Sequence, residues 1–136
     1  MTTITRFEDI EAWKTARELT VLIYRLTDQG AFARDFGLKD QIRRAAVSVM
    51  SNIAEGFESA TQAQFIRYLG LAKASAGEVR SQLYVALDIH YLNDEQFRQA
   101  LDLADKSSRQ IARFMTYLEG HPEARRISED RPEYTV

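Results

Sequence analysis

The chain has 136 residues, 45% of them hydrophobic and 28% charged, which is the composition of one ordinary globular domain and not of a disordered segment. Its 18 Lys and Arg residues against 20 Asp and Glu residues give a net charge of −2, which excludes nucleic-acid or membrane binding driven by overall charge. The absence of cysteine excludes disulfide scaffolds and thiolate zinc sites. No stretch approaches the ~20 apolar residues that cross a bilayer, so we expect a cytoplasmic protein with no membrane partner.

The first two predicted helices span residues 8–28 and 38–57, where apolar side chains recur at steps of three and four residues. Gly30 follows the first helix, and a glycine just past a helix is a common stop signal. Gly56 lies near the end of the second helix. The segment between the two helices, residues 30–37, is the longest connection and is predicted to be a loop.

The third and fourth predicted helices span residues 61–91 and 94–119, and each opens with a capping box, at residues 61–64 and 93–96. Their apolar residues alternate steps of four and three, which is the seam of coiled-coil-like packing, and short connections favour antiparallel neighbours. The sequence therefore predicts an all-α, up-down-up-down, left-handed antiparallel four-helix bundle over residues 1–120. Residues 121–136 form a polar tail that holds both prolines, and we expect this tail to be mobile.

The residue inventory gives little support for catalysis. The chain has two histidines and no cysteine, and neither histidine has the glutamate three positions earlier that di-iron helical bundles use. The sequence contains no nucleophile elbow, Walker loop or His-Glu-x-x-His motif. We therefore expect a protein without enzymatic activity, metal ion, cofactor or small-molecule substrate.

A polar stripe runs beside the apolar stripe of the second helix, although Ser and Asn are mediocre helix formers. One explanation is a hydrogen-bond network against another helix or subunit, with Arg43 or Arg44 paired to an acid such as Glu78. The other is a ligand or RNA surface. We favour the network, because polar residues at heptad spacing commonly fix register and oligomeric state. The stripe consists of Gln41, Arg44, Ser48, Asn52 and Glu55.

Small residues line one face of the third helix, at Gly70, Ala74 and Gly77. A glycine inside a helix costs about 1 kcal/mol relative to alanine, so we expect a close approach of another element at this face. Tight packing within the chain or against another subunit is the favoured explanation. Alternatively, Lys73 and Arg80 lie on the same face, where cations beside accessible backbone would suit a phosphate chain.

The most recognisable string is Ser51-Asn-Ile-Ala-Glu-Gly56, which follows Phe36-Gly-Leu38 and Gln41-Ile-Arg-Arg-Ala45. Over about residues 7–118, the chain resembles the four-helix-bundle proteins encoded by intervening sequences inside bacterial 23S ribosomal RNA genes. Relatives in that family include the accessory variability determinant of diversity-generating retroelements. The resemblance implies a ring-like homopentamer and an association with RNA or with a nucleic-acid-processing protein.

The resemblance carries the family's motif residues onto this chain by position, and it implies a catalytic role for none of them. These residues are Gln41, Arg43, Arg44, Ser48, Asn52, Glu55, Gly56 and Glu78. We expect a non-enzymatic, homo-oligomeric, RNA-associated binding protein whose candidate nucleic-acid contacts are Arg43, Arg44, Lys73 and Arg80. The alternative is a protein-interaction scaffold or accessory factor without direct RNA contact, in which the same residues serve contacts between subunits.

Overall fold

The computed structural model describes residues 3–126, and within them the chain is all-α. The described residues contain no strand, and one isolated β-bridge joins Ile4 to Arg125. The predicted helical class is confirmed, and each of the four predicted helices corresponds to one long helix. A short 3-10 helix η1 and five α-helices follow in the order η1 (Phe7–Asp9), α1 (Glu11–Leu26), α2 (Gly30–Arg34), α3 (Phe36–Glu58), α4 (Gln62–Asp88) and α5 (Asp94–Gly120).

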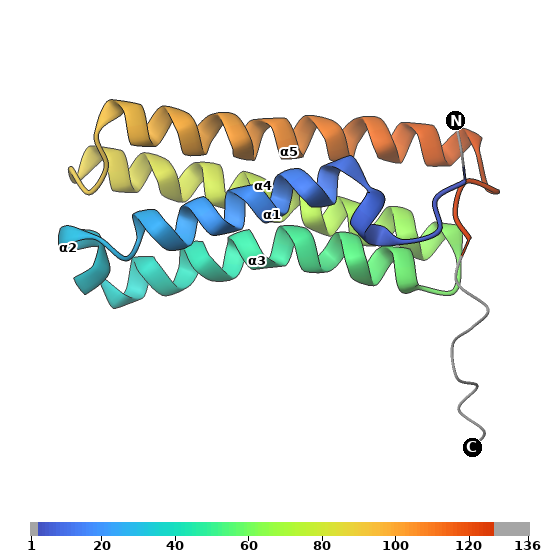
Figure 1. The fold of residues 1–136 in the computed structure, drawn as a ribbon, viewed down its shortest axis with the longest axis horizontal. Coiled ribbons are helices and arrows are strands. Elements are labelled where there is room, and N and C mark those ends of the chain that lie inside the picture. The colour runs from blue at the N-terminus through green and yellow to red at the C-terminus, as the bar shows by residue number, and fades with distance from the viewer. Residues whose placement is uncertain (1–2, 127–136) are drawn as a thin grey trace, which may run out of the picture.

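The four long helices lie side by side, and Figure 1 shows each of them running opposite to the long helix before it. Helix α3 packs against both α1 and α4, and α5 packs against both α4 and α1. Each long helix therefore has two main neighbours, and the four surround a common core. The first described residues and the segment after α5 lie together at one end of the molecule, while α2 lies at the other end (Figure 1).

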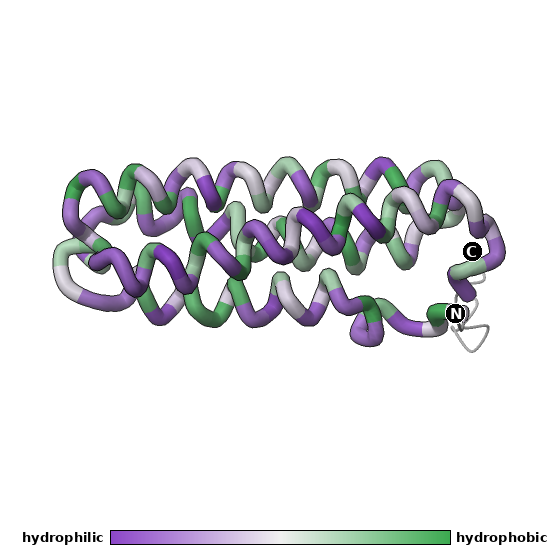
Figure 2. The backbone as a smooth tube through the Cα atoms, turned by 90° about the horizontal axis from the view of Figure 1, so that it is seen from above, coloured by the Kyte–Doolittle hydropathy of each residue, from purple (hydrophilic) through white to green (hydrophobic). Residues whose placement is uncertain are grey.

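The core consists of two clusters of buried side chains, one toward α2 and one toward the termini. The first contains Phe32 and Leu83, and the second contains Phe57, Phe65 and Ile111; each of these side chains is at most 2% exposed. Figure 2 shows hydrophobic and hydrophilic residues alternating in short blocks along the helices, as expected when each helix buries one side. No described helix is long and apolar enough to cross a membrane.

The predicted loop between the first two long helices contains the short helix α2, which the sequence analysis did not predict. Its buried residue is Phe32, which is 1% exposed and packs with its ring centroid 5.2 Å from that of Tyr91. One inward-facing aromatic residue in five gives no periodic signal, because a helix shows its period only over several turns. The segment is therefore held by tertiary packing and not by local propensity.

Asp35 accounts for the start of α3, which lies two residues before the predicted one. Its carboxylate accepts a hydrogen bond from the backbone N–H of Leu38 at 3.1 Å, so Asp35 is the N-cap of the helix. The same carboxylate accepts a hydrogen bond from the Tyr91 hydroxyl at 2.9 Å, which raises the pKa of Tyr91 above its ordinary value. Asp35 thus ties the start of α3 to the connection between α4 and α5.

The connection between α4 and α5 also differs from the prediction at one end. Helix α4 ends at Asp88 and not at residue 91, because His90 adopts a positive φ of 64°, which a right-handed helix does not continue through. The capping box predicted for the next helix is present: the Asn93 side chain accepts from the Gln96 N–H at 2.8 Å, and the Gln96 side chain accepts from the Asn93 N–H at 3.0 Å.

The expectation of a mobile tail from residue 121 needs correction for residues 124–126, because Ala124 is buried and these three residues form hydrogen bonds with distant parts of the chain. The Ile4 N–H donates to the Ala124 carbonyl, and the Arg126 N–H donates to the Ile4 carbonyl, both at 2.7 Å. The Arg125 guanidinium donates to carbonyls at the end of α3, where unpaired C=O groups need donors. Residues 127–136 lie outside the described part of the chain.

Candidate functional site

A groove between α1 and α3 brings together two of the four predicted RNA contacts. Two adjoining hollows of about 500 Å³ and 490 Å³ share Tyr24 and Arg43 in their linings. We call this surface the α1–α3 groove and define it by Tyr24, Arg25, Arg43, Arg44 and Val47. Helix α1 supplies the tyrosine and one arginine, and α3 supplies the other three residues.

Arg43 is held in the groove by the end of α1. Its Nε donates to Thr27 Oγ1 at 2.8 Å, and its Nη2 donates to the Tyr24 carbonyl at 3.3 Å. Its guanidinium carbon also lies 4.3 Å from the centre of the Tyr24 ring, within the range of a cation–π contact. A cation at a helix C-terminus donates to free carbonyls and complements the helix dipole. Arg43 therefore stabilises the end of α1, and it also brings a positive charge to the groove.

Arg44 is the freer cation of the pair. Its side chain is 79% exposed, and its Nε lies 2.8 Å from Asp40 Oδ2 one turn earlier on the same helix. An exposed pair of this kind contributes on the order of 0.3–0.5 kcal/mol, so a stronger anion competes easily for the arginine. The expected pairing of Arg43 or Arg44 with Glu78 is wrong, because Arg43 turns toward α1 and Arg44 pairs within its own helix.

The α1–α3 groove combines cations with exposed apolar surface. Tyr24 is 42% exposed, and Val47 on the facing helix is also exposed. Asp28 and Asp40 line the same hollows, so the groove is not uniformly positive. Such a surface suits a ligand that presents both flat apolar rings and phosphates. Among residues 3–126, no group of three or more His, Cys, Asp or Glu side chains is placed to hold a metal ion.

Lys73 and Arg80 lie on a different side of the molecule. A Cβ at Gly70 would lie 3.8 Å from a methionine of α5, and the Tyr84 ring lies 5.0 Å from a phenylalanine of α5. Lys73 and Arg80 are three and four residues from these positions along α4, so they flank the seam between α4 and α5. The four predicted RNA contacts therefore do not form one patch: two line the α1–α3 groove and two lie at the α4–α5 seam.

The polar stripe of the second predicted helix forms hydrogen bonds with α4, as the favoured explanation stated. The Ser75 hydroxyl donates to Ser48 Oγ at 2.9 Å, and Asn52 Nδ2 donates to the same oxygen at 2.9 Å. Two turns further along α4, Gln82 Nε2 donates to Gln41 Oε1 at 3.4 Å and to a Glu78 oxygen at 3.3 Å. These bonds form a polar network between α3 and α4, within one chain.

The small residues of α4 do not share one explanation. A Cβ at Gly70 would make an ordinary contact at 3.8 Å, and a Cβ at Gly77 would meet nothing within 4 Å. Ala74 is exposed. Tight packing within the chain therefore does not explain Gly77, and packing of Gly77 against another subunit stays a prediction. The tight approach occurs instead at Gly56, which is buried, while its neighbour Glu55 is exposed.

The residues of the groove that sequence reasoning missed are Tyr24, Arg25 and Val47. The available signal was an aromatic residue outside the apolar stripe of the first helix, with a cation directly after it. This pair indicates a binding surface only when the position of the neighbouring helix is known, because α3 supplies the other cations of the groove. Arg125 was missed for the same reason: it contacts carbonyls of residues that precede it by more than sixty positions.

Comparison with known proteins points to one family. A solved structure from Bacteroides thetaiotaomicron, described as a protein with unknown function from the S23 ribosomal protein family, matches with a TM-score of 0.70 at 21% identity. The match covers 76% of this chain and 97% of that chain, and it shows a common fold. None of the curated proteins matches the chain. Residues 8–113 match the family described as 23S rRNA-intervening sequence protein, which confirms the resemblance noted in the sequence. The chain belongs to the family of 23S rRNA-intervening sequence proteins.

Proposed function

We propose that this chain is a non-enzymatic, RNA-associated binding protein that contacts RNA through the α1–α3 groove. The observation that carries the proposal is the exposed ring of Tyr24 among the guanidinium groups of Arg25, Arg43 and Arg44. The family description, which refers to an intervening sequence in 23S rRNA, supports RNA as the class of partner. The proposal includes a cytoplasmic location, because ribosomal RNA is found there.

Each part of the groove matches a part of an unpaired RNA segment. Aromatic side chains stack on bases, which contributes roughly 1–3 kcal/mol per base, and guanidinium groups donate to phosphate oxygens. Arg43 braces the Tyr24 ring through its cation–π contact, and the tyrosine remains 42% exposed. Since the net charge of −2 gives no overall attraction, binding depends on this local set of cations and should weaken steeply with salt.

The proposal includes a homo-oligomer, a pentamer in the form that the family resemblance implies. Its support is the outer face of α4, which we define by Leu71, Ala74, Ser81, Val85 and Ile89. Leu71 is 47% exposed, and Val85 and Ile89 are each 46% exposed. The five residues follow one another at steps of three, seven, four and four, so they lie along one side of the helix, and an exposed row of apolar and small residues is typical of a surface that packs against another helix. A second copy of the chain is the occupant that we propose.

Within each subunit, we infer an up-down-up-down, left-handed antiparallel four-helix bundle. The support is the opposite direction of consecutive long helices in Figure 1 and the alternation of four- and three-residue steps along the buried seam of α4. That alternation matches the geometry of left-handed coiled coils, in which helices cross at about 20°. The same arrangement holds α1 beside α3 and so forms the groove.

A protein-interaction scaffold or accessory factor without RNA contact is the second candidate function. It is favoured by the polar network between α3 and α4, which uses Ser48, Asn52 and Glu78 inside one chain. Family motif residues that form these hydrogen bonds fix the packing of two helices, so they are not available to bind a ligand. In this case the α1–α3 groove would receive a protein partner.

Fluorescence anisotropy with a structured 23S rRNA fragment tests the function directly. We expect the native protein to bind at low salt and to lose affinity as salt rises. Tyr24→Ala should weaken binding about 5-fold to 100-fold, because a base loses its stacking surface, whereas Tyr24→Phe keeps the ring and retains the affinity. Tyr84→Ala is the matched control, since Tyr84 is a tyrosine on α4 that is 51% exposed, against 42% for Tyr24, and lies outside the groove. Absence of binding at low salt would reject the RNA proposal in favour of the scaffold.

A further inference from the structure

A second groove, with a volume of about 490 Å³, lies between α1 and α5. We call it the α1–α5 groove and define it by Lys14, Arg17, Val21 and Arg25 of α1 and by Leu103 of α5. Figure 1 shows α1 between α3 and α5, so this groove and the α1–α3 groove flank the same helix. Val21 and Arg25 line hollows on both sides of α1, so the two grooves meet across the exposed face of that helix.

Two arginines of the α1–α5 groove have no ion-pair partner. Within the described part of the chain, neither Arg17 nor Arg25 forms an ion pair. Lys14 lies 3.2 Å from a Glu11 oxygen, but both side chains are exposed, so this pair is weak and a phosphate competes for the ammonium group. The described residues that line the groove include these three cations and one carboxylate, that of Glu18. The groove therefore attracts negative charge, although the whole chain has a net charge of −2.

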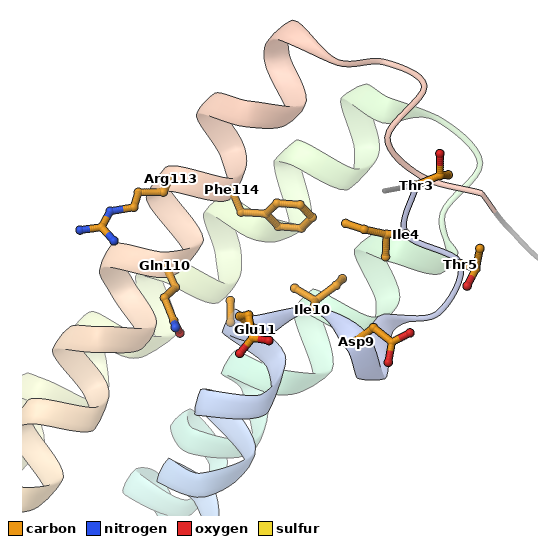
Figure 3. A pocket seen from close by; sticks show the side chains of 10 residues that line it. Thr3, Ile4, Thr5, Asp9, Ile10, Glu11, Gln110, Arg113 and Phe114 are labelled. Carbon is orange, nitrogen blue, oxygen red and sulfur yellow. The ribbon is translucent and has the colours of Figure 1, made fainter. Parts of the chain in front are cut away.

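The pocket at the end where the described termini meet differs from this groove, because its interior is apolar. Figure 3 shows the side chains of Ile4, Ile10 and Phe114 facing one another across it, and the Arg113 guanidinium extending away from them. Apolar walls do not distinguish one apolar ligand from another. The cations of the α1–α5 groove, by contrast, select a ligand by its negative charge.

The spacing of the cations favours an extended anion over a small one. Lys14, Arg17, Val21 and Arg25 follow one another at steps of three, four and four residues, so they lie along one side of α1. A helix rises about 1.5 Å per residue, so Arg17 and Arg25 lie about 12 Å apart along the axis and suit two separate phosphates better than one. The whole row, from Lys14 to Arg25, is about 16 Å long and faces several phosphates of a single nucleic-acid strand.

An exposed apolar surface connects the two grooves. Val21 is 44% exposed and Tyr24 is 42% exposed, and they are three residues apart on α1. Arg25 directly follows the tyrosine and lines hollows on both sides of the helix. Apolar and aromatic side chains contact bases, and cations contact phosphates, so this surface matches a strand that carries both. An inorganic anion has no group that would contact Val21 or Tyr24.

We propose that the α1–α5 groove is a second phosphate-binding site for the RNA strand whose base stacks on Tyr24. The strand crosses the exposed face of α1 over Val21 and Arg25, and its phosphates reach Arg17 and Lys14. This inference rests on the proposed RNA binding by the α1–α3 groove, and it extends that function by assigning a longer unpaired segment as the ligand. A segment of several nucleotides is within the range of about 4–16 nucleotides that one single-strand-binding OB fold occupies.

Fluorescence anisotropy with labelled oligouridine of increasing length tests the path of the strand. Oligomers of about 4 nucleotides fill the α1–α3 groove alone, whereas oligomers of about 12 nucleotides reach both grooves. For the native protein, we expect the affinity to rise with length by more than the statistical gain from additional binding registers. The slope of log affinity against log salt should become steeper by about 0.7 for each further phosphate contact of a single strand.

Two substitutions at adjacent positions change the charge of the α1–α5 groove in opposite directions. Arg17→Gln removes a phosphate contact and should lower the affinity for long oligomers about 5-fold at about 0.1 M salt, which is the factor that a slope change of about 0.7 gives. Glu18→Gln removes the carboxylate of the groove and should raise that affinity about 2-fold to 5-fold. Neither substitution should change the affinity for short oligomers, because both positions lie outside the α1–α3 groove. Arg67→Gln is the matched control, since Arg67 is an exposed arginine of α4 outside both grooves and its loss should leave native affinity at every length.

The outcomes separate the second site from the function on which it rests. Equal native affinity for short and long oligomers would overturn the second site and leave RNA binding by the α1–α3 groove intact. The same holds if Arg17→Gln lowers the affinity for long oligomers no more than Arg67→Gln does. Absence of binding at every length at low salt would overturn both proposals. Oligoglutamate of equal charge has no bases, so displacement of long oligouridine by an equal concentration of it would overturn RNA as the ligand of the groove.

Discussion

At Gly56, α3 and α4 approach so closely that no side chain fits between them. A Cβ at this position would lie 2.8 Å from Tyr68 Cβ, 2.9 Å from Phe65 Cδ1 and 3.2 Å from the Phe65 carbonyl oxygen. Two of these atoms belong to the backbone or its first side-chain carbon, so they move only if the helix moves. The glycine that ends the recognisable string of the second predicted helix is therefore a packing requirement.

Gly56→Ala should lower the free energy of unfolding by about 1–3 kcal/mol, because overpacking outweighs the usual gain in helix propensity. Gly77→Ala is the matched control: a Cβ there meets nothing within 4 Å, so it should raise the free energy of unfolding by about 1 kcal/mol. Urea unfolding of both variants measures the two changes. A Gly56→Ala protein as stable as the native chain would contradict the close approach of the helices.

Arg43 shows the limit of assigning a residue's role from sequence alone. Its position beside Arg44 marks it as a candidate RNA contact, and the structure gives it partners on α1 at sequence separations of 16 and 19 residues. Contacts between residues so far apart in sequence result from the packing of two helices, and the local periodicity of the sequence does not reveal them. The same holds for Lys73 and Arg80, whose separation from the α1–α3 groove becomes apparent only once α4 is placed against α5.

Among whole elements, the long helices were predictable because each spans several turns of a regular apolar pattern. The start of α5 was predictable to the residue, because Asn93 and Gln96 form a capping box and their three-residue spacing identifies that motif in the sequence. Helix α2 and the ordered segment 124–126 were not predictable, since tertiary contacts hold them: the buried Phe32 holds the first, and Arg125 and the backbone hydrogen bonds with Ile4 hold the second. Local sequence patterns therefore determine the helices, whereas contacts with residues distant in sequence determine the structure of the connections.

The outer face of α4 is predicted to form the contact between subunits. If it packs against a second copy, Val85→Glu should place a charge in the contact and reduce the mass in solution to the 15.6 kDa of one chain. The native protein should have a mass of about 78 kDa, five times that value. Val21→Glu is the matched control, because Val21 is similarly exposed on α1, and it should leave the mass unchanged.

Multi-angle light scattering provides these masses. A native protein with the mass of one chain would contradict the homo-oligomer, and an unchanged mass for Val85→Glu would show that the outer face of α4 is not the contact. Neither result bears on the groove, because Tyr24 and Arg44 lie on α1 and α3.

For the whole molecule, the two surfaces proposed for RNA and for a second copy of the chain have separate places and separate tests. The α1–α3 groove lies between α1 and α3, and the outer face of α4 lies on another helix. A substitution in one of them should leave the other intact, since sites without shared partners behave nearly additively. RNA binding through the groove is the claim on which the account of function depends.

The salt dependence of RNA affinity in two single variants tests that claim most directly. Arg44→Ala should weaken binding and reduce the slope of log affinity against log salt by about one, because one phosphate contact is lost. Lys73→Ala removes an exposed cation of α4 that lies outside the α1–α3 groove and should leave both affinity and slope at native values. No binding of native protein at low salt, or an equal loss of slope in both variants, would contradict RNA recognition by the α1–α3 groove.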